Sequence, residues 1–247
     1  MNSPERTRVA EPTFIRLLAR FTGDGRPQSG PSLPEQLSRW IDWTPAVALS
    51  RALDGRPVAL HAGASTSVAT QWAEQQGEVA RVRASLSSAI AAMPGADLRD
   101  PAPCAPDFAT LRTHYLTTQR AMQTATGKLR GQLRDMLAGA SEDMARLAGV
   151  DALMEQVLSP REHRLLDAVP VLLEEHFERL RGTAEDASPR SHLAVDAPAM
   201  PGMGSSRFRK DLQDALLAEL EFRFLPIEGL LAALRTQLQG SHVQTFA

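Results

Sequence analysis

Two heptad repeats, over residues 68–93 and 108–136, restrict this chain to a small number of folds. In each repeat, apolar and small side chains recur at alternating steps of four and three, which places one stripe of a helix against a partner. The two stripes are Val68, Trp72, Gln75, Val79, Val82, Leu86, Ala89 and Met93, and Phe108, Leu111, Tyr115, Thr118, Met122, Ala125, Leu129, Gln132 and Met136. Prolines between the repeats prevent one continuous helix. We therefore predict two long helices that fold back on one another, with Trp72 near Leu129.

The rest of the chain also favours helices. Alternating runs of Val, Ile, Thr and aromatic residues, which are typical of strands, are nearly absent, and Tyr115 is the only tyrosine. Hydrophobic residues make up 43% of the 247 positions, which is enough for a buried core. We expect an all-α fold with short N-terminal helices, a long antiparallel helical hairpin or coiled-coil-like bundle, a flexible linker and a C-terminal helix.

Residues 1–60 are predicted to form a region of short helices. Apolar side chains at 14–21 indicate one amphipathic helix, and a capping box at 32–35 opens a second that runs through Trp40. A third begins at Thr44 and is followed by proline at the first helical position, with a glycine just past its end. We expect these helices to form a compact set.

Residues 61–182 are predicted to form the long-helix bundle. Beyond the two repeats, a weaker helix covers 141–157, and Ser159-Pro160 with a glutamate two residues later has the pattern of a new helix start. Pro170 lies inside the helix that would follow, so we expect a kink there.

Residues 183–205 are predicted to be a flexible linker, because Ala, Pro, Gly, Ser and Met dominate without apolar periodicity. Residues 206–240 then carry a helical apolar stripe that is expected to bend at Pro226. This amphipathic helix either folds back across its own chain or inserts into a groove of another protein.

Charge is distributed unevenly over the bundle. Residues 106–140 carry five basic and two acidic side chains, whereas residues 141–182 carry five basic and nine acidic ones. These segments would attract one another. The simpler interpretation is that they pack together within the chain, and the alternative is a basic helix held for a partner.

Composition excludes several classes of function. The net charge of −2 gives no general attraction to nucleic acid, so binding through Arg112, Arg120, Lys128, Arg130 and Arg134 is the weakest hypothesis. Cys104 is the sole cysteine, which rules out an internal disulfide and favours a reducing compartment. No apolar run is long enough to span a bilayer. We therefore expect a cytoplasmic protein that has no transmembrane segment and binds no nucleic acid.

No sequence motif predicts a chemical mechanism. Phosphate loops, dinucleotide-binding glycines, zinc-protease motifs and paired cysteines are all absent, and nothing near Cys104 would activate its thiol. We predict no catalytic, cofactor-binding or metal-binding residues and no cofactor. The alternative is an enzyme or small-ligand-binding bundle with a site built from scattered positions such as His114, Tyr115 and His176.

Five residues are candidate partner contacts. Trp40 and Trp43 are three apart, so one of them is a possible interaction anchor even though core packing is the usual role of tryptophan. Arg207, Arg209 and Lys210 open the last predicted helix, where positive charge opposes the helix dipole. That arrangement is consistent with contact to an acidic surface.

Several short runs carry a resemblance to a known family: residues 13–18, the run Leu37-Ser38-Arg39-Trp40-Ile41-Asp42-Trp43-Thr44, residues 158–162 and residues 217–220. In these the chain resembles a bacterial family of helical proteins of similar length, catalogued only as a domain of unknown function. The resemblance spans nearly the whole chain and implies no catalytic residues. It implies a cytosolic accessory role beside motor-stator-like and peptidoglycan-binding envelope proteins, whose genes neighbour those of the family.

The leading hypothesis from sequence is therefore a cytoplasmic helical interaction protein, an adaptor or assembly factor with an unidentified protein partner. Its motivation is long helical seams without recognisable chemistry. A heptad stripe does not reveal whether its partner is internal, so a homodimer is also compatible with the pattern.

Overall fold

The computed structural model describes residues 13–21, 43–54, 65–93, 107–186 and 203–245, and all regular structure within them is helical. The helices are α1 (Thr13–Phe21), α3 (Trp43–Asp54), α4 (Ser65–Ala91), α5 (Phe108–Ala140), α6 (Glu142–Asp167), α7 (Val169–Asp186) and α8 (Met203–Thr245). The predicted all-α fold is confirmed. The helix predicted around residue 35 and residues 187–202 of the predicted linker lie outside the described residues.

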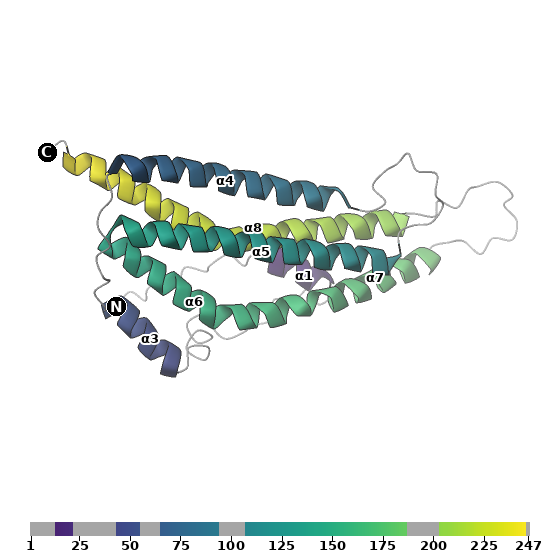
Figure 1. Ribbon diagram of the computed structural model, residues 1–247. Helices are drawn as coiled ribbons and strands as arrows, with labels where there is room; N and C mark the ends of the chain where they lie inside the picture. The colour runs from purple at the N-terminus through teal and green to yellow at the C-terminus, as the bar shows by residue number, and fades with distance from the viewer. Residues whose placement is uncertain (1–12, 22–42, 55–64, 94–106, 187–202, 246–247) are drawn as a thin grey trace, which may run out of the picture.

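The long helices form a bundle with α5 and α8 at its centre (Figure 1). These two helices run parallel: Phe108 lies near Phe208, with ring centroids 6.1 Å apart, and further along both helices Tyr115 contacts Glu219. On one side α4 contacts both central helices. On the other side α7 contacts both, whereas α6 packs on α5 and reaches α8 through the Glu162–Arg223 ion pair. The contact between α4 and α5 agrees with the predicted hairpin, and α8 completes its core.

The predicted stripes are buried, with a drift along each helix. On α4, Val79, Leu86 and Met93 are buried as expected, but Ile90 is fully buried in place of the exposed Ala89. On α5 the same drift makes Leu133 and Leu137 the fully buried positions near the C-terminal end, in place of Gln132 and Met136. A straight α-helix has 3.6 residues per turn, so a heptad stripe rotates slowly around it.

The prediction of a helix start at Ser159 is wrong. Helix α6 begins after Ser141, whose hydroxyl accepts a hydrogen bond from the Met144 amide at 3.3 Å, and continues to Asp167 with Pro160 inside it. The ribbon of α6 bends along its length (Figure 1). Asp151 before Pro160 contacts Arg130 of α5, and His163 after it contacts Gln123 of the same helix, so tertiary contacts hold both halves in one bent helix.

A break, and not only a kink, lies before Pro170. Helix α6 ends at Asp167, Ala168 caps it, and α7 begins at Val169. Pro170 has no amide hydrogen for the carbonyl of Leu166, which instead accepts from the Ala168 amide. The helix predicted to span this region is thus two helices, α6 and α7.

The two described helices of the N-terminal region lie on different parts of the bundle. Helix α1 packs on α7 and α8, where Phe14 stacks with Phe222 at 6.4 Å and Phe21 with His176 at 4.7 Å. Helix α3 packs on α6. Phe14 and Phe21 of α1 extend the buried core outwards, whereas the described side chains of α3 are half-buried or exposed.

The C-terminal helix folds back on its own chain. Helix α8 runs the length of the bundle, contains Pro226 and is bent, as predicted (Figure 1). Its buried apolar side chains are Phe208, Leu212, Ala215, Leu216, Leu220, Phe224, Ile227, Leu230 and Leu234. This arrangement decides between the two alternatives left open by the sequence.

In the described part of the chain, no helix combines the length and apolarity needed to cross a membrane.

Candidate functional site

A carboxylate is buried at the centre of the bundle, between α5 and α8. Glu219 of α8 is completely inaccessible to solvent. Its Oε2 accepts a hydrogen bond from the Tyr115 hydroxyl at 2.8 Å, and the Gln119 amide donates to that hydroxyl at 3.2 Å. A buried charge requires such partners, because its transfer out of water is unfavourable by several kcal/mol.

Arg223 neutralises this carboxylate and links it to α6. One helical turn beyond Glu219, its Nε and Nη2 donate to Glu219 Oε1 at 2.9 and 2.7 Å. Its Nη1 donates to Glu162 of α6 at 3.1 Å, and the Arg223 side chain is only 7% exposed. The guanidinium therefore connects two helices through two carboxylates.

The environment keeps Tyr115 protonated. Burial raises the pKa of the Tyr115 phenol well above its usual range, and the neighbouring Glu219 charge raises it further. The hydroxyl thus acts as a hydrogen-bond donor to Glu219. Because the phenol keeps its proton, it is poorly suited to be a general base.

A second ionic cluster joins α5 to α6. Arg130 makes a bidentate contact with Asp151, with Nε to Oδ2 at 2.8 Å and Nη2 to Oδ1 at 2.7 Å, and Arg134 reaches Glu155 at 2.6 Å. Burial lowers the pKa of Arg130, but Asp151, Glu155 and Glu162 outweigh it, so the net shift is upward. The four paired side chains are between 14 and 28% exposed. The oppositely charged segments therefore pack together within the chain, as the simpler interpretation predicted.

The three positions proposed for a scattered site are not brought together. Tyr115 contacts Glu219, whereas His176 Nε2 contacts Asp211 at 2.8 Å. These two partners are eight residues apart on α8, about 12 Å along its axis. His114 has a pKa lowered by burial, and its Nε2 has no hydrogen-bond partner among the described residues.

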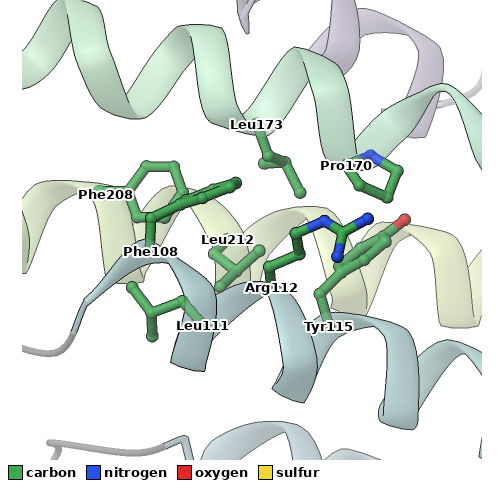
Figure 2. Close-up of a pocket in the computed structure, with 8 residues that line it drawn as sticks. All are labelled: Phe108, Leu111, Arg112, Tyr115, Pro170, Leu173, Phe208 and Leu212. Carbon is green, nitrogen blue, oxygen red and sulfur yellow. The ribbon is translucent and has the colours of Figure 1, made fainter.

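One shallow depression lies where α5, α7 and α8 meet. It is lined by Phe108, Leu111, Arg112, Tyr115, Pro170, Leu173, Phe208 and Leu212. In Figure 2 the Arg112 guanidinium lies between Pro170 and the Tyr115 ring. The depression has no space for a water molecule. Within the described ranges, no three His, Cys, Asp or Glu side chains are grouped to hold a metal ion.

The predicted partner contacts are only partly described. Trp40 lies outside the described residues, and Trp43 is the first residue of α3 with a side chain that is not described. Arg207 and Lys210 are exposed near the start of α8, and Arg209 is half-buried.

Two of the five residues proposed for nucleic-acid binding are engaged within the chain. Arg130 and Arg134 are paired with α6, which leaves Arg112, Arg120 and Lys128 exposed on α5. The basic surface available to a nucleic acid is correspondingly smaller than the sequence indicated.

The sequence interpretation missed Glu219 and Arg223. Glu219 lies on the apolar face of α8, because it follows Phe208 by eleven residues, close to three full turns. Arg223 follows Glu219 by about one more turn and lies on the same face. An acid and a base four apart within an apolar stripe are the signal that predicts a buried ion pair. A solvated pair would be expected on the opposite face.

The fold and its internal networks define a helical bundle in which the described buried charges are paired with one another. The model of one family, described as a protein of unknown function (DUF3348), matches residues 1–236. The chain therefore belongs to the DUF3348 family, which confirms the resemblance to a family of unknown function. No curated protein and no solved structure gives a match.

Proposed function

We propose that this protein is a non-catalytic helical interaction protein, an adaptor or accessory factor that binds another protein at the junction of α6 and α7. The observation that carries the proposal is a pair of exposed apolar side chains. Leu165 is 68% exposed and Val171 is 56% exposed, on either side of the break at Ala168. We call Leu165, Ala168 and Val171 the junction surface.

Exposed large hydrophobic side chains are close together at the junction surface and far apart elsewhere in the described chain. The other exposed large hydrophobic side chains among the described residues are Ile15, Leu53, Leu147 and Leu225, on four different helices. Leu165 and Val171 are the two most exposed and lie within seven residues of chain. Single exposed apolar residues are normal, but two this close in the chain favour a binding surface. Burying a large apolar side chain contributes about 1.5–3 kcal/mol to association.

Binding has more support than catalysis at the candidate site. The hydrogen-bonding groups of Tyr115, Glu219 and Arg223 are directed at one another, and the neighbouring depression has no room for a ligand. An enzyme or small-ligand-binding bundle would need buried polar groups directed at an open space. The alternative proposed from sequence therefore has less support.

The proposal places this protein in the cytoplasm, with a protein partner that belongs to an envelope-associated complex. The support for this setting is the family resemblance described from the sequence and the absence of paired cysteines. Coiled-coil-like packing of the long helices would serve as the scaffold. A homodimer formed through the junction surface is the second arrangement to test.

The test compares the full chain with the double substitution Leu165→Glu and Val171→Glu. We expect tagged wild-type protein to recover a reproducible partner, or to dimerise in light scattering, and the variant to lose that interaction. The matched control is Leu225→Glu, which places the same charge at another exposed leucine. Equal recovery by all three proteins, or no partner and no dimer with wild-type protein, would contradict the proposal.

A further inference from the structure

Helix α6 is attached to the bundle differently from α7. Helix α6 has two buried apolar side chains, Ala148 and Leu166. Between them, three acidic side chains contact α5 and α8. These are Asp151, Glu155 and Glu162, which we call the acidic stripe. Spacings of four and seven residues keep them on one face of the helix.

The acidic stripe lies on a complementary basic stripe, formed by Arg130 and Arg134 of α5 and Arg223 of α8. At about 100° per residue, Thr126 and Leu137 share the side of α5 that carries Arg130, and both are buried. The covered surface is thus a basic stripe beside two buried positions, Thr126 and the apolar Leu137. This combination suits an acidic amphipathic helix.

The contacts of α6 are easier to exchange than those of α7. Ionic contacts that are 14 to 28% exposed are weakened by competing charges, whereas α7 is held by fully buried apolar side chains such as Val169 and Leu173. Between the two helices, Pro170 cannot donate a hydrogen bond to Leu166 across the junction. The helical hydrogen bonding is therefore interrupted at Ala168, between the ion-paired stripe of α6 and the fully buried Val169 of α7, and this makes Ala168 the natural hinge.

We propose that the basic stripe is a docking surface for an acidic amphipathic helix of a partner protein, and that α6 occupies it as an internal ligand until the partner displaces it. This inference rests on the proposed function and adds the chemistry of the partner and a means of regulation. Charge complementarity supports this occupant, because the three arginines are each paired with a carboxylate of α6. An apolar partner helix would leave Arg130 and Arg134 without their acidic partners.

Hydrogen exchange of the full chain, followed by mass spectrometry, tests whether α6 opens separately. The variant Asp151→Asn with Glu155→Gln keeps the shape of the side chains and removes both charges. We expect exchange in α6 to rise about tenfold or more, since a weakened charged hydrogen bond is worth about one factor of ten. Exchange in α5, α7 and α8 should stay as in the wild type.

The matched control is Glu174→Gln with Glu175→Gln, which removes two exposed carboxylates from α7. Its exchange should equal that of the wild type. In 1 M NaCl, where screening acts over about 3 Å, wild-type α6 should also exchange faster. Unchanged exchange in α6, or equal acceleration of all helices, would overturn separate opening of α6.

A labelled synthetic peptide of residues 141–164, which carries the acidic stripe and ends before Leu165, then tests the docking surface. We expect it to bind the full-length variant Asp151→Asn with Glu155→Gln at least about tenfold more tightly than wild type, because the variant's own α6 competes less. A peptide with the same two substitutions should bind at least about tenfold more weakly. No binding, or equal binding of the two peptides, would overturn the proposal. Neither measurement uses the junction surface, so failure here is distinguishable from failure of the proposed function.

Discussion

Glu219 illustrates how single residues are fixed inside this bundle. It lies on the buried face of α8, where apolar side chains precede and follow it, and its two carboxylate oxygens accept hydrogen bonds from Tyr115 and Arg223. A network of this kind stabilises one particular alignment of α5 and α8, since sliding either helix by one turn would leave the carboxylate unpaired. The residues with the least apolar character thus specify the register of the core.

Removing the charge of Glu219 should destabilise the protein strongly. In Glu219→Gln, Arg223 keeps only Glu162 as an ionic partner, so we expect the free energy of unfolding to fall by roughly 3 kcal/mol. Tyr115→Phe removes one hydrogen bond and should cost about 1 kcal/mol. Urea denaturation measures both. The control Glu221→Gln alters an exposed residue of the same helix and should change stability by no more than about 0.5 kcal/mol.

The phenol of Tyr115 should make stability depend on alkaline pH. Its pKa is raised in the folded state, first by burial and then by Glu219, whereas the unfolded chain ionises near the usual value of about 10. The contribution of the protonated phenol is therefore fully present below pH 10 and is lost as the pH rises further. Tyr115 is the only tyrosine, so ultraviolet absorbance of the phenolate reports on it alone. A phenolate that forms near pH 10 while circular dichroism still shows the folded helices would contradict the assignment.

At the scale of elements, local sequence signals identified most helices but not their joints. The heptad stripes predicted α4 and α5, because a periodic apolar face is a property of the helix itself. The Ser159-Pro160 pattern predicted a helix start that does not exist. Asp151 before it contacts α5 and Glu162 after it contacts α8, and these contacts keep α6 continuous. The sequence pattern predicted that Pro170 lies inside one helix, but Ala168, two residues before it, separates helix α6 from helix α7. Tertiary contacts decide which proline bends a helix and which divides two helices.

The difference between local sequence signals and tertiary contacts also explains how much of the candidate site was predictable. Opposite net charges of two segments indicated that α5 and α6 attract, and the ion pairs of Arg130 and Arg134 agree with this. The partnership of Tyr115 with Glu219 was not predictable from spacing, because the two residues are 104 positions apart in the chain and the alignment of their helices depends on the whole fold.

Glycines within the long helices should be sites of easy stabilisation. Gly77 of α4 and Gly127 of α5 are exposed, and a methyl group added at either would meet no atom within 4 Å. Each substitution to alanine should raise the free energy of unfolding by about 0.5–1 kcal/mol, because glycine loses more backbone freedom in a helix. If the two helices are continuous, the two increases in the free energy of unfolding should add in the double variant, as measured by urea denaturation. Destabilisation would indicate that one of these helices is interrupted at its glycine.

At the scale of the whole molecule, α8 is the element that organises the bundle. It contacts α1, α4, α5 and α7, whereas α4 and α7 lie on opposite sides of the central pair. It also supplies Glu219 and Arg223, which join the core to α5 and α6. The last helix in the sequence therefore completes the packing of helices formed earlier in the chain, and the bundle depends on contacts between distant segments.

A chain that ends at residue 202 should consequently fail to form the bundle. Loss of α8 would expose the faces of α4 and α5 that pack on it, and fully buried side chains such as Leu111 and Met122 would lose their environment. We expect residual helical signal without a cooperative unfolding transition, measured by circular dichroism during thermal and urea denaturation. The matched control ends at residue 240, beyond Leu234, which is the last buried side chain among those described, and should unfold like the full chain. Cooperative unfolding of the shorter chain at an unchanged midpoint would mean that α8 is a tethered helix available to another protein, because a helix integral to the core cannot be removed without loss of stability.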